Sequence, residues 1–158
     1  FSLLEKDNAM WVITKTKVKI NKLPLWNDDV SIRTWPMGAD GVRCNRCYQI
    51  IKDNEILING ITEWVIIDAT TRTLRKVETT SYPNDIDWIT EKSIEEKFRR
   101  FKDDFTENDV VYKRLIRSGD IDVTHHTNNV TYITMLLDTF SVKELENMSL
   151  RKKINIIV

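Results

Sequence analysis

The sequence contains no apolar run that approaches the roughly 18 residues of a membrane-spanning helix, and its first residues lack the basic-then-apolar order of a secretion signal. It also lacks an excess of charge, because 24 Lys and Arg residues balance 24 Asp and Glu residues. A neutral chain gives no electrostatic reason to expect binding to nucleic acid or to a membrane surface. We therefore expect a cytoplasmic protein without a membrane span and without a nucleic-acid partner.

Cysteine is scarce, since Cys44 and Cys47 are the only two. Their C-x-x-C spacing occurs in redox and zinc motifs, but residues 42–51 (VRCNRCYQII) have the pattern of a strand. Residues three apart on a strand point to opposite faces, so the two sulfur atoms would diverge. No second cysteine pair completes a zinc site. We predict two structural cysteines and no metal.

The first half of the sequence is rich in strand patterns. Apolar and polar residues alternate, with many β-branched and aromatic side chains, and Pro, Gly, Asn and Asp mark the connections. The predicted strands are 11–20, 30–35, 42–51 and 56–67. Long strands joined by short turns form an antiparallel sheet, which must bury one face against another element. No adequate helix is predicted before Val77, so we expect the helical partner of this sheet to be absent from the sequence.

Residues 78–108 change in character and are predicted to form an ordered linker. They are rich in charge, and a helix is predicted over 93–101, where Ile94, Phe98 and Phe101 would share one face.

A second unit is predicted over 109–158. It begins with a strand at 110–117 and continues with a helix at 129–140, for which Asn128 is the expected N-cap. A short helix at 142–147 and an unpartnered strand at 151–158 follow. Because such a unit cannot cover its own helix, we expect the chain to continue beyond both ends.

The polar segment 117–132 lies between the predicted strand and the predicted helix. It holds two carboxylates and two imidazoles beside a helix start, whose unpaired N–H groups suit a carbonyl oxygen that gains negative charge. A carboxylate there can attack or activate water, and an imidazole can orient water or move protons. A solvated turn with ordinary helix caps remains an alternative. A metal site built from Asp120, Asp122, His125 and His126 is another, although adjacent histidines on an extended segment point apart.

Three stretches carry distinctive patterns of Trp, Pro, Asp, His and Asn. Residues 122–132 read DVTHHTNNVTY, residues 63–77 read EWVIIDATTRTLRKV, and residues 11–35 contain WV, PLW and VSIRTW in that order. They are similar to the D-x-N-x-H-V-N-N-x-x-Y, S-x-W-V-x-x-D-x-x-T-R-R-P-x-R and W-V…P-x-W-x-x-x-V-x-I-x-T-W patterns of the acyl-acyl-carrier-protein thioesterase family. The order and spacing match over nearly the whole chain, so the sequence as a whole resembles this family.

The resemblance implies an α+β fold of two tandem hot-dog units, each an antiparallel sheet wrapped around a helix. Residues 1–77 would be a first unit without its leading strand and helix, 78–108 a linker, and 109–158 the start of the second unit with the catalytic motif. The implied activity is hydrolysis of fatty acyl-acyl-carrier-protein to free fatty acid and carrier protein, without a metal or organic cofactor. The partners would be the acyl carrier protein and its fatty acyl thioester.

Carried over by position, the resemblance implies that Asp122 is the catalytic carboxylate and that His126 orients or activates water. Thr124 stands where the family has Asn, and a hydroxyl lacks the paired donor and acceptor of an amide. The start of the helix at Asn128 and Asn129 would hold the oxyanion. Two other functions remain open: hydrolysis of acyl-CoA by a hot-dog enzyme, and a non-catalytic or degenerate acyl-binding module.

Basic and aromatic residues of the first unit have weaker assignments. Arg72, Arg75 and Lys76 are candidates for docking an acidic carrier protein, although solvated surface is the ordinary role of such residues. Trp35 and Trp64 are expected in the core, and the resemblance would allow some of these side chains to line an acyl tunnel.

Overall fold

The computed structural model describes residues 2–83, 86–100, 102, 104–123, 125–149 and 154–157. The chain forms two compact units. The first comprises the residues up to Lys97 together with the last strand, and the second comprises Phe98–Arg151.

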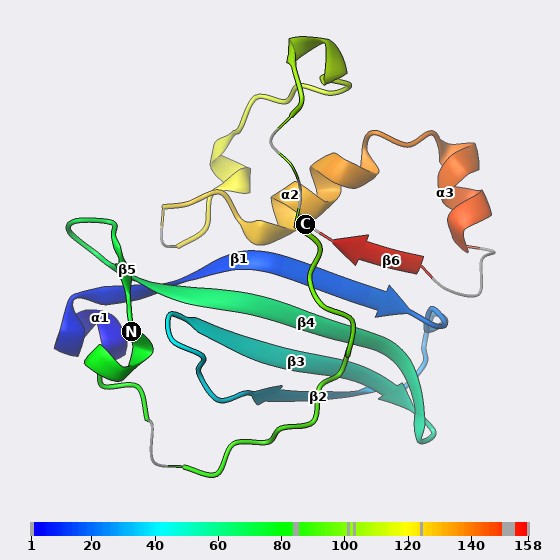
Figure 1. Ribbon diagram of the computed structural model, residues 1–158. Helices are drawn as coiled ribbons and strands as arrows, with labels where there is room; N and C mark the ends of the chain where they lie inside the picture. The colour runs from blue at the N-terminus through cyan, green and yellow to red at the C-terminus, as the bar shows by residue number, and fades with distance from the viewer. Residues whose placement is uncertain are drawn as a thin grey trace. The chain divides into compact units, whose positions relative to one another are not determined.

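Within the described residues, the first unit contains one antiparallel sheet of six strands (Figure 1). The spatial order is β2-β3-β4-β1-β6, and the short β5 pairs with β4. The strands are β1 (Ala9–Ile20), β2 (Ser31–Pro36), β3 (Arg43–Lys52), β4 (Glu55–Asp68), β5 (Leu74–Arg75) and β6 (Ile154–Ile157). The four strands predicted in the first half of the sequence are confirmed, each to within about two residues at its ends, because their alternation reflects a sheet with two chemically different faces.

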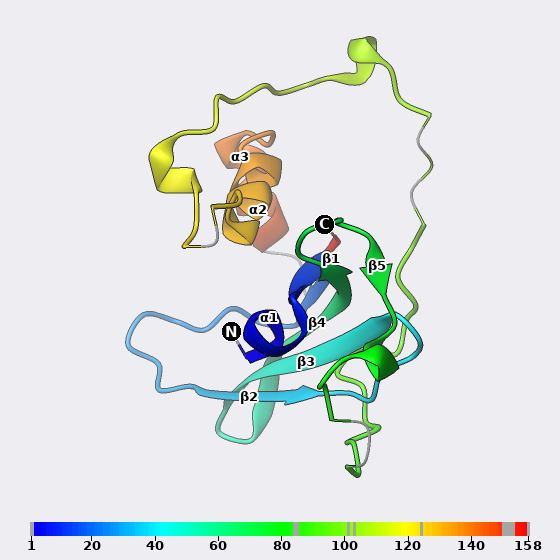
Figure 2. The same ribbon diagram turned by 90° about the vertical axis from the view of Figure 1, so that its left-hand side faces the viewer.

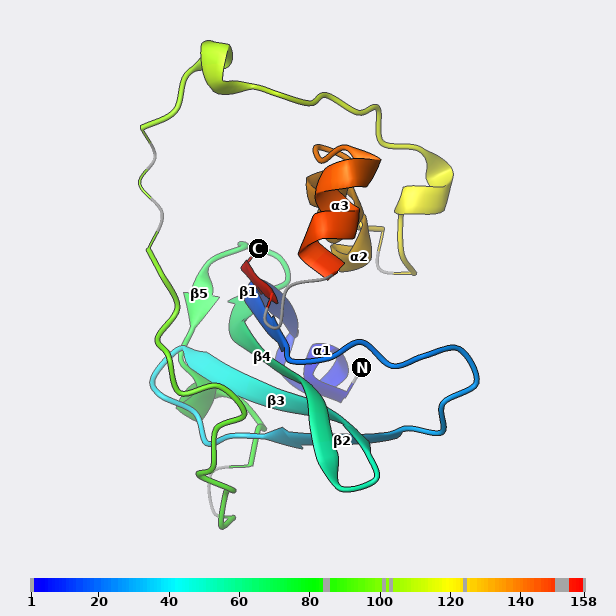
Figure 3. The same ribbon diagram turned by 90° about the vertical axis from the view of Figure 1, so that its right-hand side faces the viewer.

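The β3–β4 hairpin turns through Asp53 and Asn54, which have φ angles of 49° and 65° (Figure 3). Positive φ at both central residues matches the twist of the flanking strands, and Asn and Asp tolerate this conformation better than most residues. The turn, together with a register shift between Ile50 and Ile51, sets the register that places Cys44 opposite Trp64 and Cys47 opposite Ile61.

A small core lies on one face of the sheet, which we call the cavity face. Ala9, Cys44, Ile66 and Val77 are buried there, and Trp11, Trp64 and Tyr82 pack against them. Cys47 leaves β3 from the opposite face because it is three residues from Cys44. Both cysteines are buried and free, as expected for structural residues.

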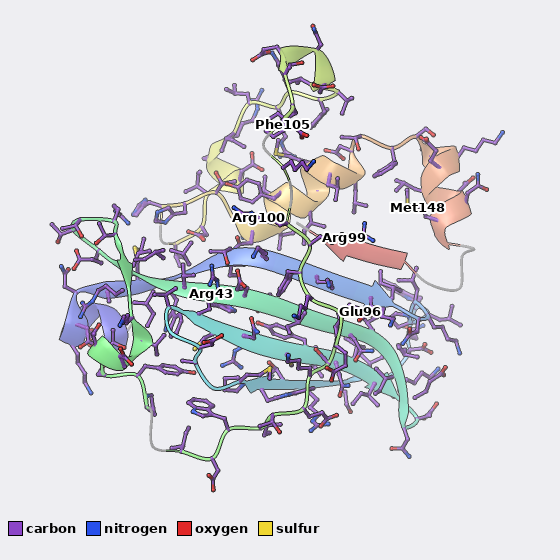
Figure 4. All side chains as sticks on the ribbon, in the orientation of Figure 1. Arg43, Glu96, Arg99, Arg100, Phe105 and Met148 are labelled. Atoms are coloured by element: carbon purple, nitrogen blue, oxygen red, sulfur yellow. The ribbon has the colours of Figure 1, made fainter. Side chains whose placement is uncertain are left out.

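A segment that we call the strap, residues 86–97, follows the sheet. Its second part, residues 91–97, contacts the opposite face, whereas Trp88 in its first part stacks on Tyr82. The Ser93 hydroxyl donates to the carbonyl of Gly60 at 2.6 Å, and the buried Lys17 ammonium donates to the carbonyl of Glu96 at 2.7 Å. The indole N–H of Trp35 donates to the carbonyl of Glu91 at 2.9 Å. Figure 4 labels Glu96, whose carboxylate also pairs with Lys19 at 3.3 Å. Trp35 is 3% exposed beneath the strap, which confirms its core assignment.

The helix predicted over 93–101 is wrong. Residues 93–100 have no helical structure, and Phe101 lies outside the described residues. The carbonyls of Glu96 and Lys97 accept from Lys17 rather than from amides farther along the strap. Ile94 is 4% exposed, so the segment buries its apolar residue in the first unit without forming a helix.

Ile94→Ala is expected to lower the free energy of unfolding of the first unit by about 2–4 kcal/mol, because it removes a buried side chain and leaves a cavity. Ile89, on the same strap, is 46% exposed. The matched variant Ile89→Ala is therefore expected to cost about 0.5 kcal/mol or less. Denaturant titration of both variants checks this, and equal losses would show that Ile94 does not anchor the strap.

Two features of the first unit differ from the sequence prediction. A short helix, α1 (Ser2–Asp7), precedes β1 (Figure 2). It is too short to show periodicity, and tertiary bonds hold it, since the Asp7 carboxylate accepts from both the amide and the hydroxyl of Ser81.

The strand predicted at 151–158 is not unpartnered: β6 pairs antiparallel with β1, with Lys17 opposite Ile157.

The second unit contains two α-helices, α2 (Asn129–Leu137) and α3 (Val142–Ser149), within its described residues. Both helices were predicted, although α2 ends before Phe140. The second unit also contains two short 3-10 turns, η2 (Glu107–Asp109) and η3 (Ser118–Asp120). The first unit contains a similar turn, η1 (Val77–Thr79). The strand predicted at 110–117 is wrong, because no described strand pairs with it; Val111 and Leu115 are 84% and 74% exposed.

Candidate active site

The described residues from the end of η3 to the start of α2 form a loop closed by hydrogen bonds, which we call the carboxylate loop (residues 120–123 and 125–128). The N–H of Asp122 donates to the carbonyl of His126 at 2.9 Å, and the N–H of His126 donates back to Asp122 Oδ1 at 3.3 Å. His125 N–H donates to the carbonyl of Asp122 at 3.0 Å. The bridge between Ile121 and Thr127 closes the loop on the outside. These bonds bring the two principal candidates, Asp122 and His126, into one small ring.

The backbone of His125 has a φ of 61°, which turns the chain back within the ring. Asp122 is half-buried, whereas His125 and His126 are exposed. Thr124, the third candidate, lies outside the described residues. The ring thus holds a carboxylate beside a residue whose imidazole reaches solvent.

The helix start follows the ring directly. Asn128 is the N-cap of α2, as predicted, and its side-chain oxygen accepts from the N–H of Val130 at 3.0 Å. The N–H of Asn128 itself donates to the carbonyl of Asp120 at 2.7 Å. Asn129 is the first residue of the helix and is exposed. The positive end of the α2 dipole therefore lies next to Asp122 and His126 in the chain.

Asp120 was predicted as a possible metal ligand, but in the structure its carboxylate forms an ion pair and caps the η3 turn. Its side chain is 9% exposed, and Oδ1 accepts from Arg114 Nη2 at 2.6 Å. Oδ2 accepts from the N–H of Arg117 at 2.9 Å. Within the described part of the chain, no group of three or more His, Cys, Asp or Glu side chains could hold a metal ion. The R-x-x-D spacing of residues 117–120 was the sequence signal for this cap.

The three basic candidates lie in the first unit and differ in what they contact. Arg75 is half-buried, and its guanidinium donates to the carbonyls of Asp7 and Thr79. Arg72 and Lys76 are exposed, and Lys76 pairs with Glu78 at 3.5 Å. Arg75 thus holds α1 and η1 together, while Arg72 and Lys76 present charge to solvent.

A cavity of about 200 Å³ opens on the cavity face of the first unit. Trp64 lines it, together with Trp11, Pro36, Cys44, Asn45, Arg46 and Tyr82. Burial raises the pKa of the Cys44 thiol, and burial, with the nearby Cys44, raises the pKa of Tyr82 to about 12. Both groups are therefore neutral at physiological pH. Three aromatic side chains line the cavity beside the polar Asn45 and the charged Arg46.

The chain matches two family models. The acyl-ACP thioesterase N-terminal domain matches residues 1–83, and the acyl-ACP thioesterase C-terminal domain matches residues 102–157.

No helix in the described parts of the chain combines the length and apolar character needed to cross a membrane.

Curated relatives include a chloroplastic acyl-[acyl-carrier-protein] hydrolase of Cuphea viscosissima, 30% identical over 154 residues, and a chloroplastic palmitoyl-acyl carrier protein thioesterase of Cuphea hookeriana, 32% identical over 153 residues. In both comparisons the alignment covers 92% of this chain and 36% of the relative. The chain therefore spans about a third of the length of these relatives.

Solved structures show the same fold. An acyl-ACP thioesterase from Bacteroides thetaiotaomicron superposes with a TM-score of 0.72 at 24% identity, and the 12:0-ACP thioesterase from Umbellularia californica with a TM-score of 0.73 at 20% identity. Each match covers 92% of this chain and 58% of the other. The predicted α+β hot-dog fold is confirmed by this likeness.

Proposed function

Because the chain belongs to the acyl-ACP thioesterase family, we propose that its protein hydrolyses the thioester between a fatty acyl chain and the acyl carrier protein. The products are free fatty acid and carrier protein. The observation that carries the proposal is the carboxylate loop, in which Asp122 and His126 are bonded into one ring directly before α2.

In the proposed reaction a water molecule attacks the thioester carbonyl carbon, and Asp122 takes the proton from that water. His126 orients the water and relays the proton from Asp122 to the departing thiolate. The C–S bond breaks when the tetrahedral intermediate collapses, so the net reaction adds one water molecule. A thiolate leaves readily, which is why little acid assistance is needed.

The oxyanion of this intermediate is proposed to bind at the start of α2. The N–H of Asn128 is already bonded to Asp120, so the N–H of Asn129 is the better donor of the two candidates. Thr124 is proposed to help hold the water or the substrate through its hydroxyl, a single donor in place of the amide that the family has there. No metal or organic cofactor takes part.

The domain boundaries are proposed in the same terms. Residues 1–77 belong to a first hot-dog unit, 78–108 to a linker, and 109–158 to a second unit that carries the catalytic motif. The last strand of this second unit, β6, pairs with β1 in the sheet of the first compact unit. The strap supports a linker that is ordered rather than free, since its backbone is bonded to Lys17 and Trp35 of the sheet.

The first unit is proposed to supply contacts to the substrate. The cavity suits an apolar acyl chain, because Trp11, Trp64 and Tyr82 in its lining can bury apolar surface. The charged Arg46, which also lines it, donates to the Thr34 hydroxyl at 3.3 Å. Arg72 and Lys76 are proposed to meet the acidic carrier protein, and Arg75 contributes less because its guanidinium is engaged with backbone carbonyls.

We also propose that the protein acts in the cytoplasm, as the sequence predicts. The named relatives, by contrast, are chloroplastic. In either compartment the reaction ends fatty acid synthesis by releasing the acyl chain.

The test is hydrolysis by the purified protein of acyl-acyl-carrier-protein and of the matching acyl-CoA, measured by release of free thiol. We expect hydrolysis of the carrier-protein thioester with a kcat/KM at least about tenfold higher than for acyl-CoA, because only the former offers a protein surface to bind. Equal or greater activity on acyl-CoA would favour a coenzyme A thioesterase. Binding of acyl chains without hydrolysis of either substrate would favour a non-catalytic module.

A further inference from the structure

Asp120, the first residue of the carboxylate loop, connects the segment before the loop with Asn128 at the other end of the loop. Its carboxylate accepts from Arg114 Nη2 at 2.6 Å and from the N–H of Arg117 at 2.9 Å. Its backbone carbonyl accepts from the N–H of Asn128 at 2.7 Å. Both ends of the loop that contains Asp122 therefore depend on this one residue.

Arg114 extends the connection to the other end of α2. Its Nη1 lies 3.9 Å from Asp138 Oδ2, and the Tyr112 hydroxyl donates to the same oxygen at 3.2 Å. Asp138 is the C-cap of α2. The helix is thus held at its first turn through Asp120 and at its last turn through Asp138, with Arg114 common to both.

We propose that Asp120, paired with Arg114, is a positioning residue that fixes the Asp122–His126 ring against the start of α2. This inference rests on the proposed function, because it assigns Asp120 an effect on hydrolysis that acts through Asp122 and His126. A charge-assisted bond to a mostly buried carboxylate holds its geometry more tightly than a neutral one. A displacement of about 1 Å in a catalytic group is enough to lower a rate by about two orders of magnitude.

A simple turn cap is the competing role, and the chain contains a matched example of it. Asp109 closes η2 in the same way, since its Oδ2 accepts from the N–H of Thr106 at 2.7 Å. Asp109 differs because it is exposed, and its carboxylate accepts from the N–H and the hydroxyl of Thr106 within its own turn. Asp109→Asn is therefore the control for a local cap without a catalytic loop.

The first experiment compares Asp120→Asn with Asp109→Asn in the full-length protein, using acyl-acyl-carrier-protein as substrate. Asp120→Asn is expected to lower kcat by about 30- to 100-fold while KM stays within about threefold, and Asp109→Asn to change kcat by less than about twofold. In an Asp122→Asn background, Asp120→Asn is expected to lower kcat no further. An unchanged kcat in Asp120→Asn, or a full additional loss in the double variant, would overturn the inference.

The second experiment needs no activity and separates this inference from the proposed function. Hydrogen exchange of the Asn128 amide is expected to become at least about tenfold faster in Asp120→Asn, because that amide is bonded to the Asp120 carbonyl, while the amides of α3 keep their rates. Unchanged exchange at Asn128 overturns the positioning role, whether or not the protein hydrolyses thioesters. Faster exchange in a protein that hydrolyses no thioester would reject the proposed function instead. If Asp120→Asn does not fold, Arg114→Lys, which keeps the charge but loses the planar fork, takes its place in both experiments.

Discussion

Asp122→Asn is expected to lower kcat for acyl-acyl-carrier-protein by about three orders of magnitude, the largest single effect in the molecule, because an amide cannot take a proton from the attacking water. The substitution keeps the shape of the side chain and an oxygen that can accept the N–H of His126. The loop is therefore expected to stay closed while the chemistry fails. Single-turnover measurement of acyl transfer to water gives the rate directly.

Stability separates this chemical effect from misfolding. The free energy of unfolding of Asp122→Asn is expected to stay within about 1 kcal/mol of the parent, because one acceptor of a part-exposed hydrogen bond is exchanged for another. A variant that hydrolyses substrate within about tenfold of the parent rate would remove Asp122 from the mechanism. The catalytic carboxylate would then have to be another residue, and the carboxylate loop would no longer carry the proposed function.

His126→Asn is expected to lower kcat by about two orders of magnitude, whereas His125→Asn is expected to lower it by less than about threefold. The two histidines are adjacent and both exposed, so solvation alone does not distinguish them. Their backbones do: His125 occupies the positive-φ position of the turn, and the His126 amide bonds to the Asp122 carboxylate. Steady-state kinetics of the two variants on one substrate measures the difference.

Asparagine is the appropriate replacement at both positions because it tolerates the positive φ of His125 better than alanine does. A loss of activity in His125→Asn that equals the loss in His126→Asn would mean that the loop, rather than one imidazole, is what the reaction requires. The opposite order would exchange the roles of the two residues.

The sheet could be predicted from the sequence because alternation of apolar and polar residues records which face of a strand each side chain occupies. The same reasoning failed at 93–101, where Ile94 and Phe98 have helical spacing. Periodicity shows which residues would share a face in an isolated helix, but it contains no information about Lys17, whose ammonium binds the carbonyls of this segment from another part of the chain. The strand predicted at 110–117 failed for a related reason, since a strand needs a partner and a pattern does not supply one.

The site was predicted in part. The N-cap at Asn128 and the proximity of Asp122 to His126 follow from local sequence, because both depend on bonds between residues at most four apart. The proposed positioning role of Asp120 could not be predicted from local sequence, because it depends on the ion pair with Arg114 and on the burial of the Asp120 carboxylate. Carboxylates in a polar segment look alike in a sequence, and only their partners separate a buried anchor from a reactive group.

The pairing of β6 with β1 has a consequence for how the protein is made. Lys17 emerges from the ribosome about 140 residues before Ile157, its partner across the sheet. Until then the outer hydrogen-bonding groups of β1 remain available to any neighbouring chain, and such open edges promote association between nascent polypeptides. Production of soluble protein is therefore expected to depend on translation of β6, even though this strand supplies none of the proposed reacting groups.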